Sequence, residues 1–217
     1  MVNNMCNIPS KSAMEQALTE RVGEDVQHRF SRAVVAVCGL GGLGSHIAFA
    51  LARAGVGTLI LLDCDRVDLT NLNRQQYKAS QIGMEKSAAL AENLREVNPY
   101  LNYRPRTVRV TADNVRELLS GADVVCEAFD DAEEKSMLVN AVLEQLPRTA
   151  LVAASGMAGL GSPNHIQTRK IGRRFWLCGD GVSDVADLGS LFAPRVMLCA
   201  AHQALVVLRL LAGEEEA

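Results

Sequence analysis

The sequence lacks the cysteine spacing that marks zinc-binding or disulfide-bonded proteins. Its 217 residues include six cysteines, and no two of them form a CxxC pair: Cys6, Cys38, Cys64, Cys126, Cys178 and Cys199. This spacing argues against a zinc knuckle and against a disulfide framework. We therefore expect small buried thiols and no structural zinc.

Long apolar runs and a basic surplus are also missing. The apolar run Val34–Leu40 is far shorter than a membrane-spanning helix, which needs roughly 18 residues. The N-terminal residues MVNNMCNIPSKS have no apolar stretch behind a basic start, unlike a secretory leader. A formal charge of −3 and a pI of about 5.8 give no global reason to bind nucleic acid or anionic lipid. We expect a cytoplasmic protein that binds neither nucleic acid nor membrane.

Apolar, β-branched runs alternate with longer helical stretches. The predicted strands cover residues 34–38, 58–62, 123–128 and 150–153, and the predicted helices cover residues 43–54, 83–97, 112–120 and 132–145. Continuous apolar runs are typical of parallel strands that are covered on both faces. The pattern predicts an α/β fold, a Rossmann-like doubly wound and mostly parallel sheet with helices on both faces.

Both ends of the chain differ from this core. A polar helix is predicted over residues 12–30, and two short strands over residues 165–171 and 174–178. A Gly-rich loop follows them, and Pro194 then begins a long apolar helix that runs to about Ala212. At this length we expect one domain over residues 21–217, preceded by an N-terminal extension or helix over residues 1–20.

The segment GLGGLGS, residues 39–45, follows one predicted strand and begins a predicted helix. Gly39, Gly41 and Gly44 have the GxGxxG spacing of a nucleotide-binding turn. Such a turn lets phosphate or ribose approach the backbone and directs the free N–H groups of the helix toward an anion. Asp63 ends the next predicted strand 19 residues after Gly44, where a carboxylate can accept hydrogen bonds from ribose hydroxyls. Turn and acid together predict a nucleotide site.

The residues after Asp63 indicate which nucleotide chemistry is present. The segment DCDRVDLTNLNRQQY contains Asp65, Asn71 and Arg74, and Lys86 begins the following helix. Arg74 and Lys86 supply two positive charges that suit phosphate oxygens. Asp130 is at the end of the strand DVVCEAFD, along the same sheet edge, where its carboxylate could hold Mg²⁺. This cluster suits a polyphosphate, and a hydride-transfer site has no evident use for it.

Several segments then resemble one family in order and spacing. GLGGLGS, LLDCDRVDLTNLNRQ, GMEKSAALAENLREVNP, the aspartate of FDD and APRVMLCAAHQALVVLRLL resemble the ThiF/MoeB family of sulfur carrier protein adenylyltransferases, relatives of the ubiquitin-activating enzymes. The resemblance covers about residues 21–212, and MAGLGS and CGDG are most similar to the compact ThiF-like proteins of thiamine biosynthesis. It implies a homodimer that uses ATP and Mg²⁺. The expected reaction adenylates the C-terminal glycine carboxylate of a small ubiquitin-like sulfur carrier protein (ThiS-like) and releases pyrophosphate.

The resemblance also assigns roles to matching positions. It implies that Asp63 holds the ribose, that Asp130 binds Mg²⁺, and that Arg21 enters the site of the partner subunit. The expected catalytic residues are Arg74, Lys86, Asp130 and Arg21. The nucleotide-binding set expected from the family motif is Gly39, Gly41, Gly42, Gly44, Asp63, Asp65, Asn71, Asn73, Arg74 and Lys86.

The sequence departs from the family at its cysteines. Many members carry two zinc-binding CxxC pairs, which are missing here, and a cysteine that joins the carrier covalently, where this chain has Val185. Cys178 is the nearest thiol in a predicted loop, and Cys199 and His202 share one helix face, although ordinary packing explains such residues as well.

Two functions of other classes stay open at this point. One is an NAD(P)-binding oxidoreductase that shares only the glycine turn with the family. The other is a scaffold that binds a carrier protein without activating it.

Overall fold

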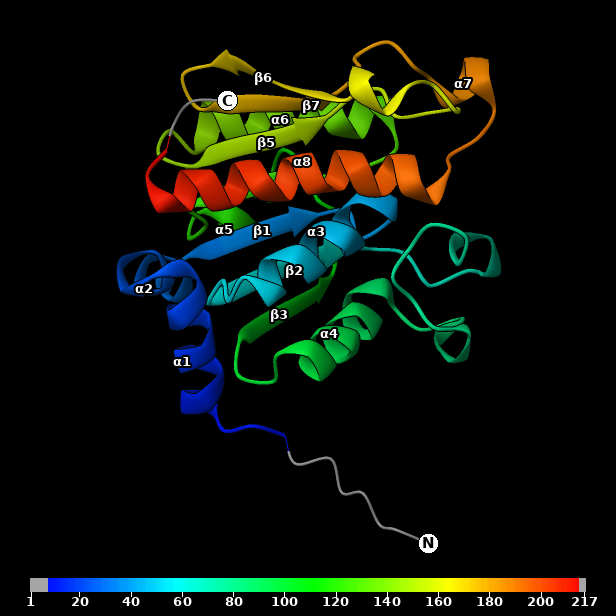
Figure 1. Ribbon diagram of the computed structural model, residues 1–217. Coiled ribbons are helices and arrows are strands. Elements are labelled where there is room, and N and C mark those ends of the chain that lie inside the picture. Colours follow the sequence, from blue (N-terminus) through cyan, green and yellow to red (C-terminus); the bar gives the residue numbers. More distant parts are fainter. Residues whose placement is uncertain (1–7, 215–217) are drawn as a thin grey trace, which may run out of the picture.

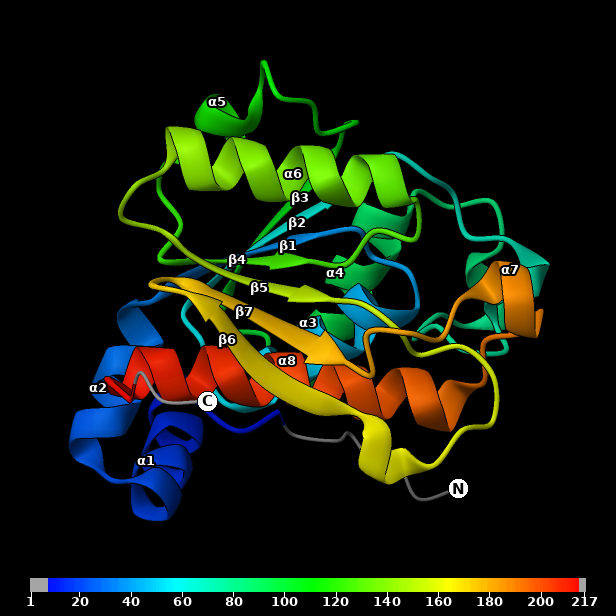
Figure 2. The same cartoon turned by 90° about the horizontal axis from the view of Figure 1, so that it is seen from above.

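The computed structural model describes residues 8–214, and they form three layers, with a sheet between two layers of helices (Figure 1, Figure 2). The sheet has seven strands in the order β3-β2-β1-β4-β5-β7-β6, and every neighbouring pair is parallel except β6 with β7. This confirms the predicted fold class. The strands are β1 (Val34–Cys38), β2 (Thr58–Asp63), β3 (Asn102–Thr107), β4 (Val124–Glu127), β5 (Ala150–Ala154), β6 (Gln167–Gly172) and β7 (Phe175–Gly179).

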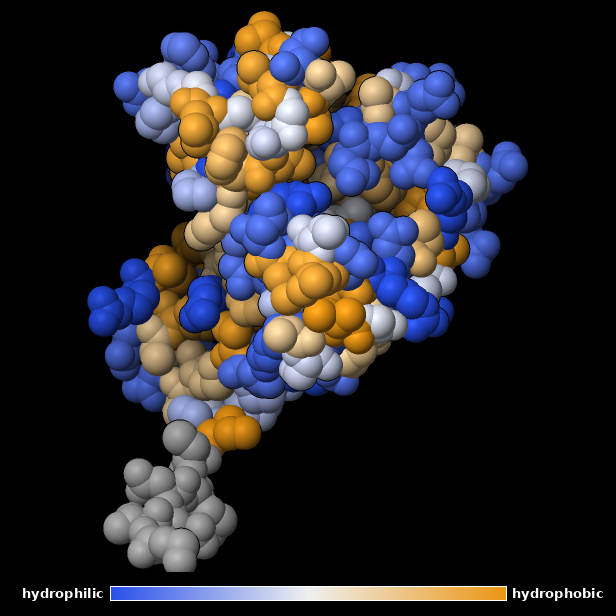
Figure 3. Space-filling model, turned by 90° about the vertical axis from the view of Figure 1, so that its right-hand side faces the viewer, coloured by the Kyte–Doolittle hydropathy of each residue, from blue (hydrophilic) through white to orange (hydrophobic). Residues whose placement is uncertain are grey.

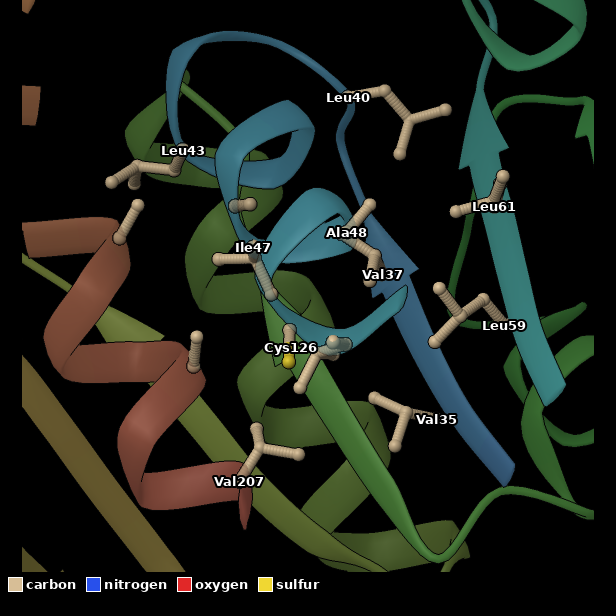
Figure 4. Close-up of a cluster of buried hydrophobic side chains, with 14 of the residues drawn as sticks. Val35, Val37, Leu40, Leu43, Ile47, Ala48, Leu59, Leu61, Cys126 and Val207 are labelled. Atoms are coloured by element: carbon tan, nitrogen blue, oxygen red, sulfur yellow. The ribbon is translucent and has the colours of Figure 1, made fainter. Parts of the chain in front are cut away.

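Helices cover both faces of the sheet because its central strands are apolar on both sides. On β1, Val35 and Val37 point into one buried cluster, and Ala36 and Cys38 point into the other. Helices α3, α4 and α8 close the first cluster, part of which Figure 4 shows, and α5 and α6 close the second. The helices are α1 (Lys11–Val22), α2 (Glu24–Arg32), α3 (Gly42–Arg53), α4 (Lys86–Val97), α5 (Val115–Leu119), α6 (Ala132–Gln145), α7 (Val185–Leu188) and α8 (Ala193–Ala212).

Three elements differ from the sequence-based prediction. Strand β3 was not predicted, because it is polar, contains Pro105 and lies at the sheet edge, where proline is tolerated. The single helix predicted over residues 12–30 is divided into α1 and α2 at Gly23, whose φ is 88°. The Gly-rich loop contains the short helix α7. The boundary that we expect between residues 20 and 21 falls within α1, and the division into an extension and a domain stays a prediction.

Helix α8 is long and apolar enough to cross a membrane by length and composition, with a mean hydropathy of 1.5. Its position in the fold supplies another reason for that composition. Val196, Cys199, Ala200 and Val207 are buried in the core, and α8 lies across the sheet beside α3 (Figure 1). The apolar face of α8 is therefore a packing surface of this fold.

The N-terminal end of α8 also holds two loops together through Arg195. The guanidinium donates to the carbonyl oxygens of Gly161, at 2.6 Å, and Ser162, at 3.1 Å, and contacts the Asp180 carboxylate at 2.5 Å. Asp180 in turn accepts the backbone N–H groups of Val182 and Ser183. Both charged side chains are buried, so neither has water as an alternative partner. This ion pair fixes residues 156–162 and 180–192 relative to each other.

We predict that Asp180→Asn lowers the free energy of unfolding by about 3–5 kcal/mol, because it leaves the buried Arg195 charge unpaired. Burial raises the pKa of Asp180, but the hydrogen bonds from Ser183, Val182 and Arg195 outweigh it and lower this pKa from 3.8 to about 2. The stabilisation is therefore fully present above pH 3.8 and is lost as the pH falls through about 2. Denaturant unfolding of both forms between pH 7 and pH 2 measures this, and a difference that does not change with pH would contradict it.

Candidate functional site

A cavity of about 350 Å³ lies over the carboxyl ends of β1, β2 and β4. In the sheet, β2 lies on one side of β1 and β4 lies on the other, so the strand order reverses at β1. Open α/β sheets bind their ligands at such a point. The cavity brings together the sequence-predicted residues Gly39, Gly41, Asp63, Asp65, Lys86 and Asp130. Residues from the turn after β1, from the end of β2 and from the loop after β4 thus share one site.

The glycine turn has the geometry that its spacing predicts. Gly39 has a φ of +89°, and a Cβ there would lie 2.7 Å from the carbonyl oxygen of Ala128, which follows β4. A Cβ on Gly44 would lie 1.8 Å from the carbonyl oxygen of Gly39, so α3 could not begin this close to β1 with a larger residue. Gly41 lines the cavity immediately before α3, and Gly44 lies behind the turn.

Asp63 is the buried acid of the cavity. Its carboxylate accepts the backbone N–H of Leu40, in the glycine turn, at 2.7 Å and that of Asp65 at 2.8 Å. The Lys86 Nζ atom lies 4.0 Å from Asp63 and 2.8 Å from the Asp65 carboxylate. Burial raises the pKa of Asp63, while the Lys86 charge and the two N–H groups lower it. Two carboxylates and one ammonium therefore meet where the turn, β2 and α4 converge.

Arg74 lies on the long loop between β2 and α4, and polar contacts attach this loop to α3. The His46 ring bonds the Arg74 carbonyl oxygen at 3.1 Å and the Gln76 side chain at 2.9 Å. Tyr77 donates to the carbonyl oxygen of Leu40 at 2.8 Å. Burial lowers the pKa of His46, although its hydrogen bond to Arg74 opposes this, so a neutral imidazole positions the loop. The Arg74 backbone is thus held in place before any ligand binds.

Asp130 follows β4 on a loop that a buried ion pair supports. Both oxygens of the Glu127 carboxylate lie 2.9 Å from the Lys135 Nζ atom, and one of them accepts the Phe129 N–H at 2.8 Å. Burial raises the pKa of Glu127, and the Lys135 charge lowers it. Within residues 8–214, no hydrogen bond or ion pair involves the exposed Asp130 carboxylate. An oxygen ligand is therefore available at the cavity.

A second cavity of about 230 Å³ adjoins the first, and both are lined by Ala128, Phe129 and Asp130. Arg74 and Gln75 form one wall of the second cavity, and the opposite wall comes from the loops that the Arg195–Asp180 pair holds together. The remaining lining is mostly small or apolar: Gly42, Leu43, Ala132, Lys135, Ser155, Gly156, Met157, Ala158, Ser183, Asp184, Val185, Leu191 and Val196. Figure 3 shows the face of the molecule on which the two cavities open.

Four of the sequence-predicted residues line neither cavity: Gly44, which lies behind the turn, Asn71, Asn73 and Arg21. The Asn71 side chain accepts the Asp68 N–H at 3.1 Å, and the Asn73 side chain accepts from Arg74 at 2.9 Å. Arg21 lies in the last turn of α1, at the opposite edge of the sheet (Figure 1). The expected roles of Asn71 and Asn73 in nucleotide binding, and of Arg21 in a partner's site, stay predictions.

The cysteines of the described residues are unpaired, and Cys6 lies outside them. Burial raises the pKa of Cys178 to about 11 and that of Cys199 to about 12, so neither is a thiolate near neutral pH. His202 is hydrogen-bonded to Thr168 at 3.0 Å. Neither thiol lines one of the two cavities, and the structure therefore favours ordinary packing for both.

The sequence did not indicate several residues of the site. Val108, Arg109 and Val110 line the first cavity from the loop after β3, a strand that was itself not predicted. Arg109 forms an ion pair with Glu134 at the rim of this cavity. Three further residues support the loops of the site: His46, Glu127 and Lys135. Each lies within a predicted strand or helix, so its ionisable side chain was the only sequence signal that could have indicated a role.

The chain is similar in sequence to several known proteins. The chain is 34% identical over 153 residues to the tRNA threonylcarbamoyladenosine dehydratase of Escherichia coli, covering 70% of this chain and 56% of that protein. It is 33% identical over 129 residues to the sulfur carrier protein adenylyltransferase of Thermus thermophilus, covering 59% of this chain and 48% of that protein. It is 31% identical over 212 residues to the adenylyltransferase and sulfurtransferase uba4 of Pyricularia oryzae, covering 91% of this chain and 43% of that protein. The chain thus spans about half the length of these relatives.

Solved structures show the same fold. The Escherichia coli tRNA N6-threonylcarbamoyladenosine dehydratase in complex with ATP matches with a TM-score of 0.84 and 24% identity over 95% of this chain and 97% of that one. The sequence model that describes the ThiF family matches residues 14–217, which include every element from α2 to α8. The chain therefore belongs to the ThiF family.

Proposed function

We propose that this protein is an ATP-dependent adenylyltransferase that activates the C-terminal glycine carboxylate of a small ubiquitin-like sulfur carrier protein. The observation that carries the proposal is the pair of adjoining cavities that share Ala128–Asp130. One cavity has the glycine turn, the buried acid and the lysine that suit a nucleotide, and the other is smaller and is lined largely by small or apolar residues. Their shared wall is where two substrates would meet. The sequence features CGDG and MAGLGS favour a ThiS-like carrier of thiamine (thiazole) biosynthesis.

The first cavity suits ATP in its shape and charge. Asp63 has lone pairs available for ribose hydroxyls beside its two backbone partners, and Val108 and Val110 offer an apolar surface for a base. Gly41 and the N-terminus of α3 would face the phosphates, with Lys86 beside them. The Escherichia coli dehydratase and the related MccB were solved with ATP, which supports the same ligand here.

The second cavity suits a polypeptide tail. The side-chain oxygen of Gln75 is buried without a partner in the described structure, so an N–H of a bound chain could satisfy it. In the reaction, a carboxylate oxygen of the tail attacks the α-phosphorus of ATP. The bond between the α-phosphorus and the bridging oxygen to the β-phosphorus breaks, and pyrophosphate leaves with that electron pair. Arg74 and Lys86 would stabilise the charge on the phosphate oxygens.

Asp130 is the residue that would hold Mg²⁺. It is an exposed hard oxygen ligand with no partner among the described residues, and it lines both cavities, so it fits the ion. Bound Mg²⁺ would supply positive charge to the phosphates. The Asp63, Cys64 and Asp65 side chains also lie close enough to hold an ion, but Lys86 already pairs with Asp65.

The proposal includes a homodimer in which Arg21 of one protomer serves the site of the other. Leu18, in the same helix as Arg21, lies close to Gly55 before β2, whereas Asp63 ends β2. A six-residue strand is roughly 20 Å long, so Arg21 does not approach the cavity of its own chain. A cytoplasmic location is part of the same proposal.

A second substrate class follows from one relative. The Escherichia coli protein is named a tRNA threonylcarbamoyladenosine dehydratase, and a threonylcarbamoyl group has a carboxylate. A carboxylate on tRNA could therefore take the place of the carrier tail. Activation of either carboxylate would use the same nucleotide cavity.

We predict that purified carriers stimulate exchange of labelled pyrophosphate into ATP. Arg74→Ala or Asp130→Ala should lower this exchange by orders of magnitude with an unchanged melting temperature, because neither side chain is part of the core. Arg66→Ala, in the same loop but outside both cavities, is the matched control. Absence of exchange with every carrier would favour the scaffold alternative, and near-normal exchange in either variant would show that the site is misplaced.

Asp63→Asn should raise the Kd for ATP by about tenfold to a hundredfold, because hydrogen bonds from ribose hydroxyls to a charged carboxylate are stronger than those to a neutral amide. Asp68→Asn, at an acid of the neighbouring loop that lines neither cavity, should leave the Kd unchanged. Calorimetry measures both, with NADH as the competing ligand. Tight NADH binding by the unmodified protein would support the oxidoreductase instead.

The homodimer can be tested by complementation. Arg21→Ala and Asp130→Ala protomers should each be inactive alone, and a mixture should regain part of the activity, because a mixed dimer has one site with both residues intact. Exchange activity before and after mixing measures this. A mixture as inactive as its components, at a dimeric mass, would contradict a role for Arg21 in the partner's site.

A further inference from the structure

Lys135 presents a positive charge to the second cavity. Among the described residues that line this cavity, the cationic side chains are those of Arg74 and Lys135, and Arg74 is accounted for by the phosphates. The Lys135 ammonium contacts both oxygens of the Glu127 carboxylate at 2.9 Å. The Lys135 side chain is 22% exposed, whereas that of Glu127 is 1% exposed. The positive member of the ion pair therefore faces the cavity, and the negative member lies behind it.

This ammonium lies next to the wall that the two cavities share. Glu127 ends β4, and the three residues after it, Ala128, Phe129 and Asp130, form that wall. One Glu127 oxygen accepts the Phe129 N–H at 2.8 Å and also contacts the Lys135 Nζ atom. A single oxygen atom thus connects the wall to the ammonium. The charge lies where an acyl substrate and a nucleotide would meet.

Glu127 does not use the whole hydrogen-bonding capacity of Lys135. An ammonium has three N–H donors, and two of them are accounted for by the Glu127 oxygens. Within residues 8–214, Lys135 has no other hydrogen-bond partner, so its third donor is available to a ligand. The backbone N–H groups of Phe129 and Ala154 also stabilise the Glu127 carboxylate. Lys135 can therefore turn toward a ligand without leaving Glu127 unpaired.

A carboxylate is the ligand that this position fits. The proposed reaction brings a carboxylate toward the phosphates of ATP, and groups of like charge repel each other. Asp130 and Asp184 also line the second cavity and add to this repulsion. A cation beside the path of approach offsets it, and a charge-assisted hydrogen bond fixes the position of the carboxylate.

We propose that Lys135 binds the carboxylate of the acyl substrate and holds it at the shared wall before it attacks the α-phosphorus. Glu127 is a positioning residue, which directs the ammonium toward the cavity. The proposal rests on the proposed function for the reaction that follows, but binding itself requires only a carboxylate. It therefore applies to a protein tail and to a threonylcarbamoyl group alike. Adenylation removes the negative charge of the carboxylate, so the contact weakens once the adenylate has formed.

The probes for this site are a short synthetic peptide that ends in Gly-Gly and the same peptide with a C-terminal amide. They differ only in the carboxylate charge. NMR titration at millimolar peptide, with α,β-methylene-ATP bound, measures both affinities. Lys135→Met removes the cation, and Lys135→Arg retains it. Lys78→Met is the matched control, because Lys78 also pairs with a glutamate, Glu96, at 2.7 Å but lines neither cavity.

The unmodified protein should bind the acid about tenfold or more tightly than the amide, as expected for one hydrogen bond to a charged group. Lys135→Met should abolish this preference, and Lys135→Arg and Lys78→Met should retain it. The Kd for the ATP analogue should be the same in every variant.

Glu127→Gln separates carboxylate binding from mere support of the loop. This variant retains the cation and removes its charged partner, so acid binding should be unchanged or stronger. A purely structural ion pair predicts the same loss as in Lys135→Met. The double variant Glu127→Gln/Lys135→Met has neither charge of the pair, so it should fold even if Lys135→Met does not, and it should show no preference for the acid.

Three results would overturn the proposal: equal affinities for acid and amide in the unmodified protein, no binding of either, or a preference that survives in the double variant. Weaker binding of the ATP analogue with an unchanged acid preference in Lys135→Met would assign the ammonium to the phosphates and would also overturn it. The expected preferences without any pyrophosphate exchange would refute adenylation and still support the carboxylate site.

Discussion

The contact on which the site depends is the acceptance of the Leu40 N–H by the buried carboxylate of Asp63, at 2.7 Å. It joins the glycine turn after β1 to the end of β2, and the second carboxylate oxygen holds the start of the following loop through Asp65. Lys86 then closes the arrangement from α4. A single buried acid thereby fixes three segments that are far apart in the chain and shapes the nucleotide cavity before a nucleotide binds.

Fixed cations are the second element of the account. Adenylation requires positive charge at defined places around phosphates, since the charge that moves lies on phosphate oxygens. Lys86 is held by two carboxylates. The backbone of Arg74 is held by His46, and the Arg74 side chain lies beside Asn73. These contacts are available only because the loop after β2 folds back on α3. The electrostatics of the site therefore follow from the packing of that loop.

The glycine turn, Asp63 and the loop of Arg74 could be recognised in the sequence, because these parts of the site belong to short continuous segments. The glycine spacing, Asp63 at a strand end and the charged run up to Arg74 can all be read without knowing the tertiary fold. The parallel sheet could be predicted for a similar reason, since strands buried on both faces are apolar throughout. Strand β3 escaped prediction because an edge strand needs neither apolar continuity nor every backbone N–H.

The wall of the second cavity that lies opposite Arg74 could not be predicted in the same way. This wall combines residues near 156 with residues near 183 and 195, and the Arg195–Asp180 pair that joins them depends on how α8 packs against the sheet. Burial, which sets the pKa values of Cys178 and Cys199, is likewise a property of the folded chain.

The central claim is that a carrier carboxylate attacks the α-phosphorus of ATP in the space between the two cavities. Labelling the C-terminal carboxylate of the carrier with ¹⁸O tests this most directly. After turnover and hydrolysis of the adenylate, the account predicts that the AMP contains ¹⁸O from the carrier and that no ADP forms. ADP as the product, with the label in inorganic phosphate, would contradict it, because the attack would then have occurred at the γ-phosphorus.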